Sequence, residues 1–201
     1  MSRFVFSIAT LAFVAFTLSA FAQEQAVRVR GTIERAEGDH YIVKARNGGE
    51  VTVKLADNAM VVALVKASLA DVKQGSYVGV SGMPQADGSQ RALEIHIFPE
   101  AMRGTGDGHR PWDLQPSSTM TNGAVEQTAA SSDGQVLTLK YKDGEKKVLV
   151  PADCPIVSYL PGDKSELKPG AAIFIAAAQK QSDGTLVTPR VNVGRGTAPP
   201  M

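Results

Sequence analysis

The chain has 201 residues, with 21 lysines and arginines against 20 aspartates and glutamates, and a formal net charge of +1. This balance excludes the basic excess that draws a protein to nucleic acid or to an acidic membrane surface. The single cysteine, Cys154, excludes an intramolecular disulfide, and no histidine lies near it in sequence to activate it as a nucleophile.

The first 22 residues have the pattern of an export signal. Arg3 precedes an apolar run that ends in Ala20-Phe21-Ala22, a small-x-small cleavage pattern. The alternative is a membrane anchor, but the run is short for a span of about 20 residues. We predict that residues 1–22 are removed and that the rest is periplasmic or secreted. No later apolar segment is long enough to span a bilayer.

An internal repeat organises the remaining chain. Three pairs of segments match in the same order with small changes of offset: 31–34 with 123–126, 70–75 with 165–170, and 94–97 with 190–193. The matches predict one β-barrel over residues 26–98 and a second over 120–194. A connector over 99–119 joins them, and a disordered tail is expected over 195–201.

Each copy has the alternation of β-strands. Ile42 and Val43 lie on one predicted strand, and Val51 and Val53 lie on alternating positions of the next. Asn47-Gly48-Gly49 between them is a hairpin turn signal. Several short strands with one helical turn predict an all-β chain of two tandem OB-like β-barrels. The alternative is one two-sheet sandwich. A copy of about 70 residues has little core of its own, so the barrels are expected to pack on each other.

The connector contains three glycines and the only tryptophan, with no periodicity. A long segment of this kind in a compact protein is usually functional or disordered. Because disordered linkers rarely contain tryptophan, we expect an ordered belt with Trp112 buried between the barrels and its indole N–H hydrogen-bonded. Arg103, His109, Arg110 and Asp113 belong to this belt. They form either an interdomain clamp or a ligand site, and the sequence leaves both open.

Four residues are candidates for a metal site: Glu94, His96, Met102 and His109. Glu94 and His96 are two residues apart and so share a strand face, which is compatible with zinc or copper ligation but also with an ordinary strand surface. No Cys or His cluster with metal-ligand spacing is present, and no catalytic motif or phosphate-binding loop is found. The sequence therefore predicts no cofactor and no enzymatic activity.

Five segments carry a resemblance to a known family: 27–31, 44–53, 69–75, 96–113 and 139–147. In these the chain resembles uncharacterised exported bacterial proteins with a small β-barrel domain of unknown function. The resemblance implies an OB-like barrel and an extracytoplasmic location. Relatives often carry an automatic label as metal transporter permeases, which a chain without later spans does not fit.

Two functional hypotheses follow. The first is a non-enzymatic binding or scaffolding module for an envelope protein, peptide or glycan, with no nucleic acid partner. The second is a weak zinc- or copper-binding protein that uses His96 and His109.

Overall fold

A computed structural model describes residues 26–197 and 199, so the predicted signal peptide lies outside the described residues. Strands form almost the whole of this part, and the helices are three short 3-10 turns. The all-β prediction is confirmed. The elements in chain order are β1 (Val27–Glu37), β2 (His40–Ala45), β3 (Glu50–Lys66), η1 (Leu69–Asp71), β4 (Tyr77–Pro84), β5 (Gln90–Phe98), η2 (Glu100–Met102), β6 (Gly108–Pro111), β7 (Thr119–Ser131), β8 (Gly134–Tyr141), β9 (Gly144–Pro151), β10 (Ile156–Pro161), η3 (Lys164–Glu166), β11 (Ala172–Lys180) and β12 (Leu186–Gly194).

Equivalent turns in the two copies have the same chemistry. Gly88 and Gly184 adopt φ values of 80° and 90°, a left-handed conformation that favours glycine. The aspartate before each glycine accepts a hydrogen bond from the backbone N–H two residues further on, from Ser89 in the first copy and Thr185 in the second. These turns set the β4–β5 and β11–β12 hairpins.

One closed five-stranded barrel consists of β1, β2, β3, β12 and β11. Neighbouring strands pair in this order, and β11 returns to β1. Its interior is aliphatic, with Val43, Ile175 and Val193 among the buried residues. We call it the β1 barrel.

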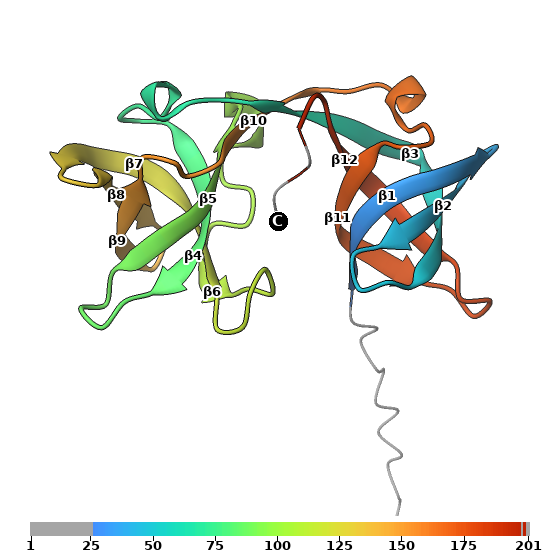
Figure 1. Cartoon of the computed structure of the whole chain (residues 1–201), viewed down its shortest axis with the longest axis horizontal. Helices are drawn as coiled ribbons and strands as arrows, with labels where there is room; N and C mark the ends of the chain where they lie inside the picture. The colour runs from blue at the N-terminus through green and yellow to red at the C-terminus, as the bar shows by residue number, and fades with distance from the viewer. Residues whose placement is uncertain (1–25, 198, 200–201) are drawn as a thin grey trace, which may run out of the picture.

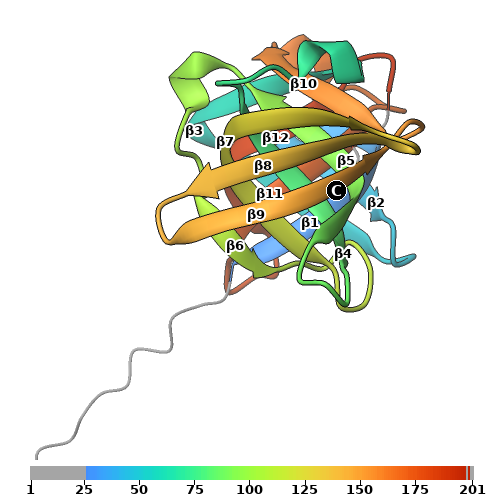
Figure 2. The ribbon, with the colours of Figure 1, turned by 90° about the vertical axis from the view of Figure 1, so that its left-hand side faces the viewer.

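A second ring of pairings consists of β7, β8, β9, β5 and β4. The β5–β9 pairing is short, and β4 returns to β7. Val78, Leu137 and Val148 are buried in its core. We call it the β7 barrel. Figure 1 shows the two barrels as separate lobes, and Figure 2 shows β7, β8 and β9 on the outer side of one of them.

The prediction that residues 26–98 and 120–194 each close their own barrel is wrong. Each barrel takes three strands from one copy and the last two strands from the other, so β4 and β5 pair with the second copy and β11 and β12 with the first. The physical reason is the length of β3. Its 17 residues continue past the β1 barrel instead of turning back into it.

The extended end of β3 pairs antiparallel with β10 between the lobes, at the top of Figure 1. Leu64 lies opposite Tyr159 and Ala63 lies opposite Leu160. Residues 95 and 191 are equivalent in the repeat and lie opposite Ile156 and Val61, so residue 64 is equivalent to 159. The Leu64–Tyr159 pair therefore maps onto itself under a local two-fold axis. The two copies are therefore related by an approximate two-fold axis that passes through this β3–β10 ladder.

The connector is ordered. It contains η2, and β6 adds to the edge of β7 in the β7 barrel. The predicted disordered tail needs a correction at its start, because the Arg195 guanidinium lies 2.7 Å from the carboxylate of Glu166 and its backbone N–H bonds to Leu64. No helix in residues 26–197 is long and apolar enough to cross a membrane.

The strand exchange predicts which cysteine pairs form a disulfide. In a Cys154→Ala background, Thr32→Cys with Ala172→Cys is expected to cross-link within one molecule, because these positions are paired across β1 and β11. Ala124→Cys with Ala172→Cys is the matched control, since those positions would be paired only if the second copy closed its own barrel. Electrophoresis of the monomer fraction checks this, and cross-linking of the control pair alone would contradict the exchange.

Candidate ligand-binding cleft

A cleft of about 290 Å³ lies between the two lobes, beneath the β3–β10 ladder. Its walls come from both barrels, from the connector and from β10. The lining residues are Arg28, Gly79, His96, Phe98, Met102, Thr105, Gly106, Arg110, Trp112, Met120, Asn122, Tyr159, Phe174, Ala176, Arg190 and Asn192. The strand exchange thus forms one site from residues that are far apart in sequence.

The two barrels present equivalent strand faces to the cleft, but their side chains differ. The repeat makes Phe174 equivalent to Gly79, and Asn192 equivalent to His96. At Gly79 a Cβ atom would lie 2.8 Å from Oδ1 of Asn122 and 3.0 Å from the ring of Phe98. The β7 barrel therefore needs glycine there and presents a recess, where the β1 barrel presents the aromatic ring of Phe174.

Trp112 lies between the lobes, where it packs with Met120 of the β7 barrel and Phe174 of the β1 barrel. The guanidinium groups of Arg28 and Arg110 lie over its ring, 4.2 and 5.6 Å from the ring centre. Its backbone is held by Ser118. The expected hydrogen bond of the indole is not formed. Nε1 is buried and has no partner among the described residues.

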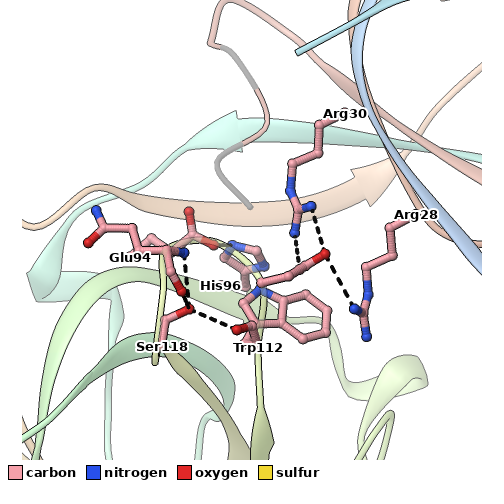
Figure 3. A network of polar contacts seen from close by, with 8 residues as sticks. Arg28, Arg30, Glu94, His96, Trp112 and Ser118 are labelled. Atoms are coloured by element: carbon pink, nitrogen blue, oxygen red, sulfur yellow. Dashed lines mark hydrogen bonds and ion pairs between the residues drawn. The ribbon is translucent and has the colours of Figure 1, made fainter. Parts of the chain in front are cut away.

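Asp113 connects the lobes electrostatically. Its carboxylate lies 2.7 Å from the guanidinium of Arg30 and 3.4 Å from that of Arg28, both on β1. Figure 3 shows Arg28 and Arg30 pointing toward Trp112 from the other barrel. The hydrogen bond from Arg30 is the main cause that lowers the pKa of Asp113. The connector is therefore a clamp between the barrels as well as a wall of the cleft.

The two arginines of the connector, Arg103 and Arg110, donate to backbone carbonyl groups. Arg103 donates to the carbonyl of Gly75 and pairs with Glu100, outside the cleft lining. Arg110 donates to the carbonyl of Gly106 at 2.6 Å. Burial and the nearby charge of Arg28 lower the pKa of Arg110. Of these two arginines, only Arg110 faces the cleft.

His96 and His109 lie on opposite faces of their sheet. Residues paired across strands share a face, and the pairs His96–Gly79 and Gly79–Asn122 place His96 on the cleft face. His109 pairs with Thr121, the neighbour of Asn122 on β7, and so faces the other way. The predicted metal site that joins the two histidines is therefore wrong. Within the described part of the chain no group of three or more His, Cys, Asp or Glu residues could hold a metal.

The remaining metal candidates have structural contacts. His96 is buried with Nδ1 3.0 Å from the Tyr159 hydroxyl and Nε2 3.1 Å from Glu94. Burial and Glu94 raise the pKa of Tyr159, so its hydroxyl keeps its proton and can donate to Nδ1. Both ring nitrogens of His96 are then engaged. Met102 packs with the cluster around Tyr159 at the rim of the cleft.

His109 has its own partner in the β7 barrel. Its Nδ1 lies 2.7 Å from Oγ1 of Thr121, which donates to Oε1 of Gln90. Since Thr121 donates its only hydroxyl hydrogen to Gln90, Nδ1 of His109 donates to Thr121. Burial, with the charges of Lys146 and Arg110, lowers the pKa of His109 and favours this neutral ring.

Sequence reasoning missed three cleft residues with polar atoms that lack partners. Oδ1 of Asn122, Oδ1 of Asn192 and Nε of Arg190 are buried without a hydrogen-bond partner among the described residues. The repeat carried a usable signal for two of them, because Asn192 and Arg190 stand at the positions of His96 and Glu94. Polar residues at equivalent strand positions in both copies indicate a shared polar face.

Comparisons of the chain with protein-family models, with characterised proteins and with solved structures give no match. The fold and the geometry of the cleft therefore carry the functional argument.

The buried Glu94–His96 pair gives a test of its structural role. His96→Leu leaves the buried Glu94 side chain without its donor and is expected to lower the free energy of unfolding by about 1–3 kcal/mol. The double variant Glu94→Leu/His96→Leu removes both polar groups and is expected to be more stable than His96→Leu alone. Urea unfolding measures this. A double variant as unstable as the sum of the two single variants would contradict the pairing.

The Asp113 clamp predicts a pH-dependent contribution to stability. Its pKa is lowered in the folded state, so the contribution is present above the unfolded pKa of about 3.9 and is lost as the pH falls through the lower folded value. Because 47% of the Asp113 side chain is exposed, Asp113→Asn should cost at most about 1 kcal/mol at neutral pH. The difference from the wild type should vanish in acid. Asp57→Asn, at an exposed carboxylate, is the control, and an equal effect there would refute the clamp.

Proposed function

We propose that this chain is a non-enzymatic binding protein of the periplasm or the extracellular medium, with its ligand site in the cleft between the barrels. The cleavage pattern at Ala20-Phe21-Ala22 supports the location. The site is supported by one observation above all. Four buried polar atoms without partners, on Trp112, Asn122, Arg190 and Asn192, belong to residues that line one cavity.

The cost of these atoms is the physical argument. A buried polar group that makes no hydrogen bond typically costs about 1–3 kcal/mol. Natural folds retain few of them, and each calls for an explanation. Four such atoms around one cavity are explained together if a bound molecule supplies their partners. An apolar cavity wall of aromatic and methionine side chains with a few polar groups is typical of small-molecule sites.

Contacts on two sides of the cleft join its walls. The β3–β10 ladder holds the barrels at the top of the cleft, and the Asp113 ion pairs hold the connector against β1. A site whose walls are already in place loses less conformational entropy when it binds. This favours a binding role for the cleft over a purely scaffolding role for the barrel surfaces.

The test is a variant that narrows the cleft. Ala176 is exposed and lines the cleft, whereas its neighbour Ala177 is exposed but is not part of the lining. Ala176→Phe should fill the cleft without disturbing the cores, and Ala177→Phe is the matched control. The probe is an envelope extract from the native host, passed through an ultrafiltration membrane that retains macromolecules. The readouts are thermal stability and the emission of the single tryptophan.

The extract should raise the melting temperature of the wild type and of Ala177→Phe, but not that of Ala176→Phe. Equal responses of the two variants would place binding elsewhere. A response obtained only with the retained macromolecules would contradict a small-molecule site and favour the scaffolding alternative.

A further inference from the structure

The charges that line the cleft have one sign. Arg28, Arg110 and Arg190 contribute guanidinium groups to its wall, and no carboxylate belongs to the lining. Asp113 pairs with Arg28 and Arg30, but Arg110 and Arg190 have no carboxylate within 4.0 Å among the described residues. Partly buried cations without counter-ions attract an anion strongly, because the surrounding dielectric is low.

The donors favour a carboxylate over a phosphate. The planar guanidinium matches a carboxylate or a phosphate through two parallel hydrogen bonds, so the preference comes from the rest of the site. Phosphates are commonly held by backbone N–H groups at the N-terminus of a helix. The only helices among the described residues are three 3-10 turns of three residues each, which are too short to form such a phosphate site. Trp112 Nε1 and Arg190 Nε add single donors suited to carboxylate oxygens.

The two asparagines of the cleft each have a side-chain oxygen that can accept a hydrogen bond from a ligand. Nδ2 of Asn122 donates to the carbonyl of Thr105 at 2.9 Å, and Nδ2 of Asn192 donates to the carbonyl of Phe174 at 3.1 Å. These bonds fix the orientation of both amides, so the atom left without a partner is in each case the oxygen. The residues are only 4% and 3% exposed. Because three guanidinium groups would repel an ammonium group, the donor that fits is a hydroxyl.

The rest of the wall is apolar. Phe98 stacks on Tyr159 with ring centres 4.9 Å apart, and Met120 and Phe174 pack with Trp112. The volume of about 290 Å³ lies at the lower end of small-molecule sites, which run from roughly 300 to 1,000 Å³. The site therefore fits a ligand with a small hydrophobic body.

Given the proposed function, on which this step rests, we infer that the cleft binds a small hydroxylated carboxylate. The carboxylate group pairs with Arg110 and Arg190, and its hydroxyl donates to Asn122 or Asn192. The hydrophobic body contacts Trp112 and Phe174.

The experiment uses three probes of nearly equal size. The first is 3-phenyllactate, which carries both groups. The second is 3-phenylpropionate, which lacks the hydroxyl, and the third is 3-phenylpropane-1,2-diol, which lacks the carboxylate. Inorganic phosphate is a fourth arm. Titration of the full chain, followed by calorimetry and by the emission of Trp112, gives each dissociation constant.

We expect 3-phenyllactate to bind about 10-fold or more tightly than 3-phenylpropionate, and about 100-fold more tightly than the diol. Arg190→Met should weaken the binding of 3-phenyllactate about 10-fold and leave the binding of the diol unchanged. Arg35→Met, an exposed position of the same barrel outside the cleft, is the control. Asn192→Asp should also weaken the binding of 3-phenyllactate relative to the wild type, since it adds a negative charge to the site.

The outcomes separate this inference from the proposed function. If the diol or phosphate binds as well as 3-phenyllactate, or no probe binds, the ligand class is wrong. In that case the proposed function still stands if the envelope extract stabilises Ala177→Phe and not Ala176→Phe. If neither the extract nor any probe distinguishes those two variants, both proposals fail.

Discussion

The arrangement of this protein depends on the antiparallel pairing of β3 with β10. β3 continues beyond its pairing with β2 and meets β10 at the approximate two-fold axis, where Leu64 lies opposite its own repeat equivalent, Tyr159. Because β3 extends away from the β1 barrel toward β10, the strands that follow it, β4 and β5, join the β7 barrel. The exchange of β4 and β5 for β11 and β12 is the consequence.

The same constraint creates the cleft. Two copies related by a two-fold axis present equivalent faces to each other, and a symmetric contact would pair like with like. Here the faces have diverged. The β1 barrel supplies Arg28 and Phe174, and the β7 barrel supplies Gly79 and Asn122. The connector, which has no equivalent in the repeat, adds Trp112 and Arg110 to one side. A cavity lined by both hydrophobic and cationic side chains results.

Local structure was largely predictable from the sequence. Alternating apolar residues and Asp-Gly or Asn-Gly turns predict the hairpins, and the repeat predicts two similar barrels. The partner of each strand was not predictable, because β5 and β12 have equivalent patterns and fit either barrel with the same contacts. The one indication was the run from Val61 to Val65, which continues β3 without a glycine or asparagine turn.

The candidate site was predictable only in part. Trp112 and Asp113 stood out because the connector lies outside the repeat, and both lie at the junction of the barrels. Asn122 looked like an ordinary residue at the start of a strand, and its role arises from distant partners such as the carbonyl of Thr105. His96 and His109 looked like a pair because they are close in sequence, but pleating places their side chains on opposite faces.

Inter-strand nuclear Overhauser effects in the unsubstituted chain test the exchange most directly. Backbone protons of β1 should show contacts with β11, and those of β4 with β7, in a sample confirmed to be monomeric. These contacts would establish that each cleft wall is built from both halves of the chain. Contacts of β1 with β4 and of β7 with β11 would show instead that each copy closes its own barrel, and would contradict the account.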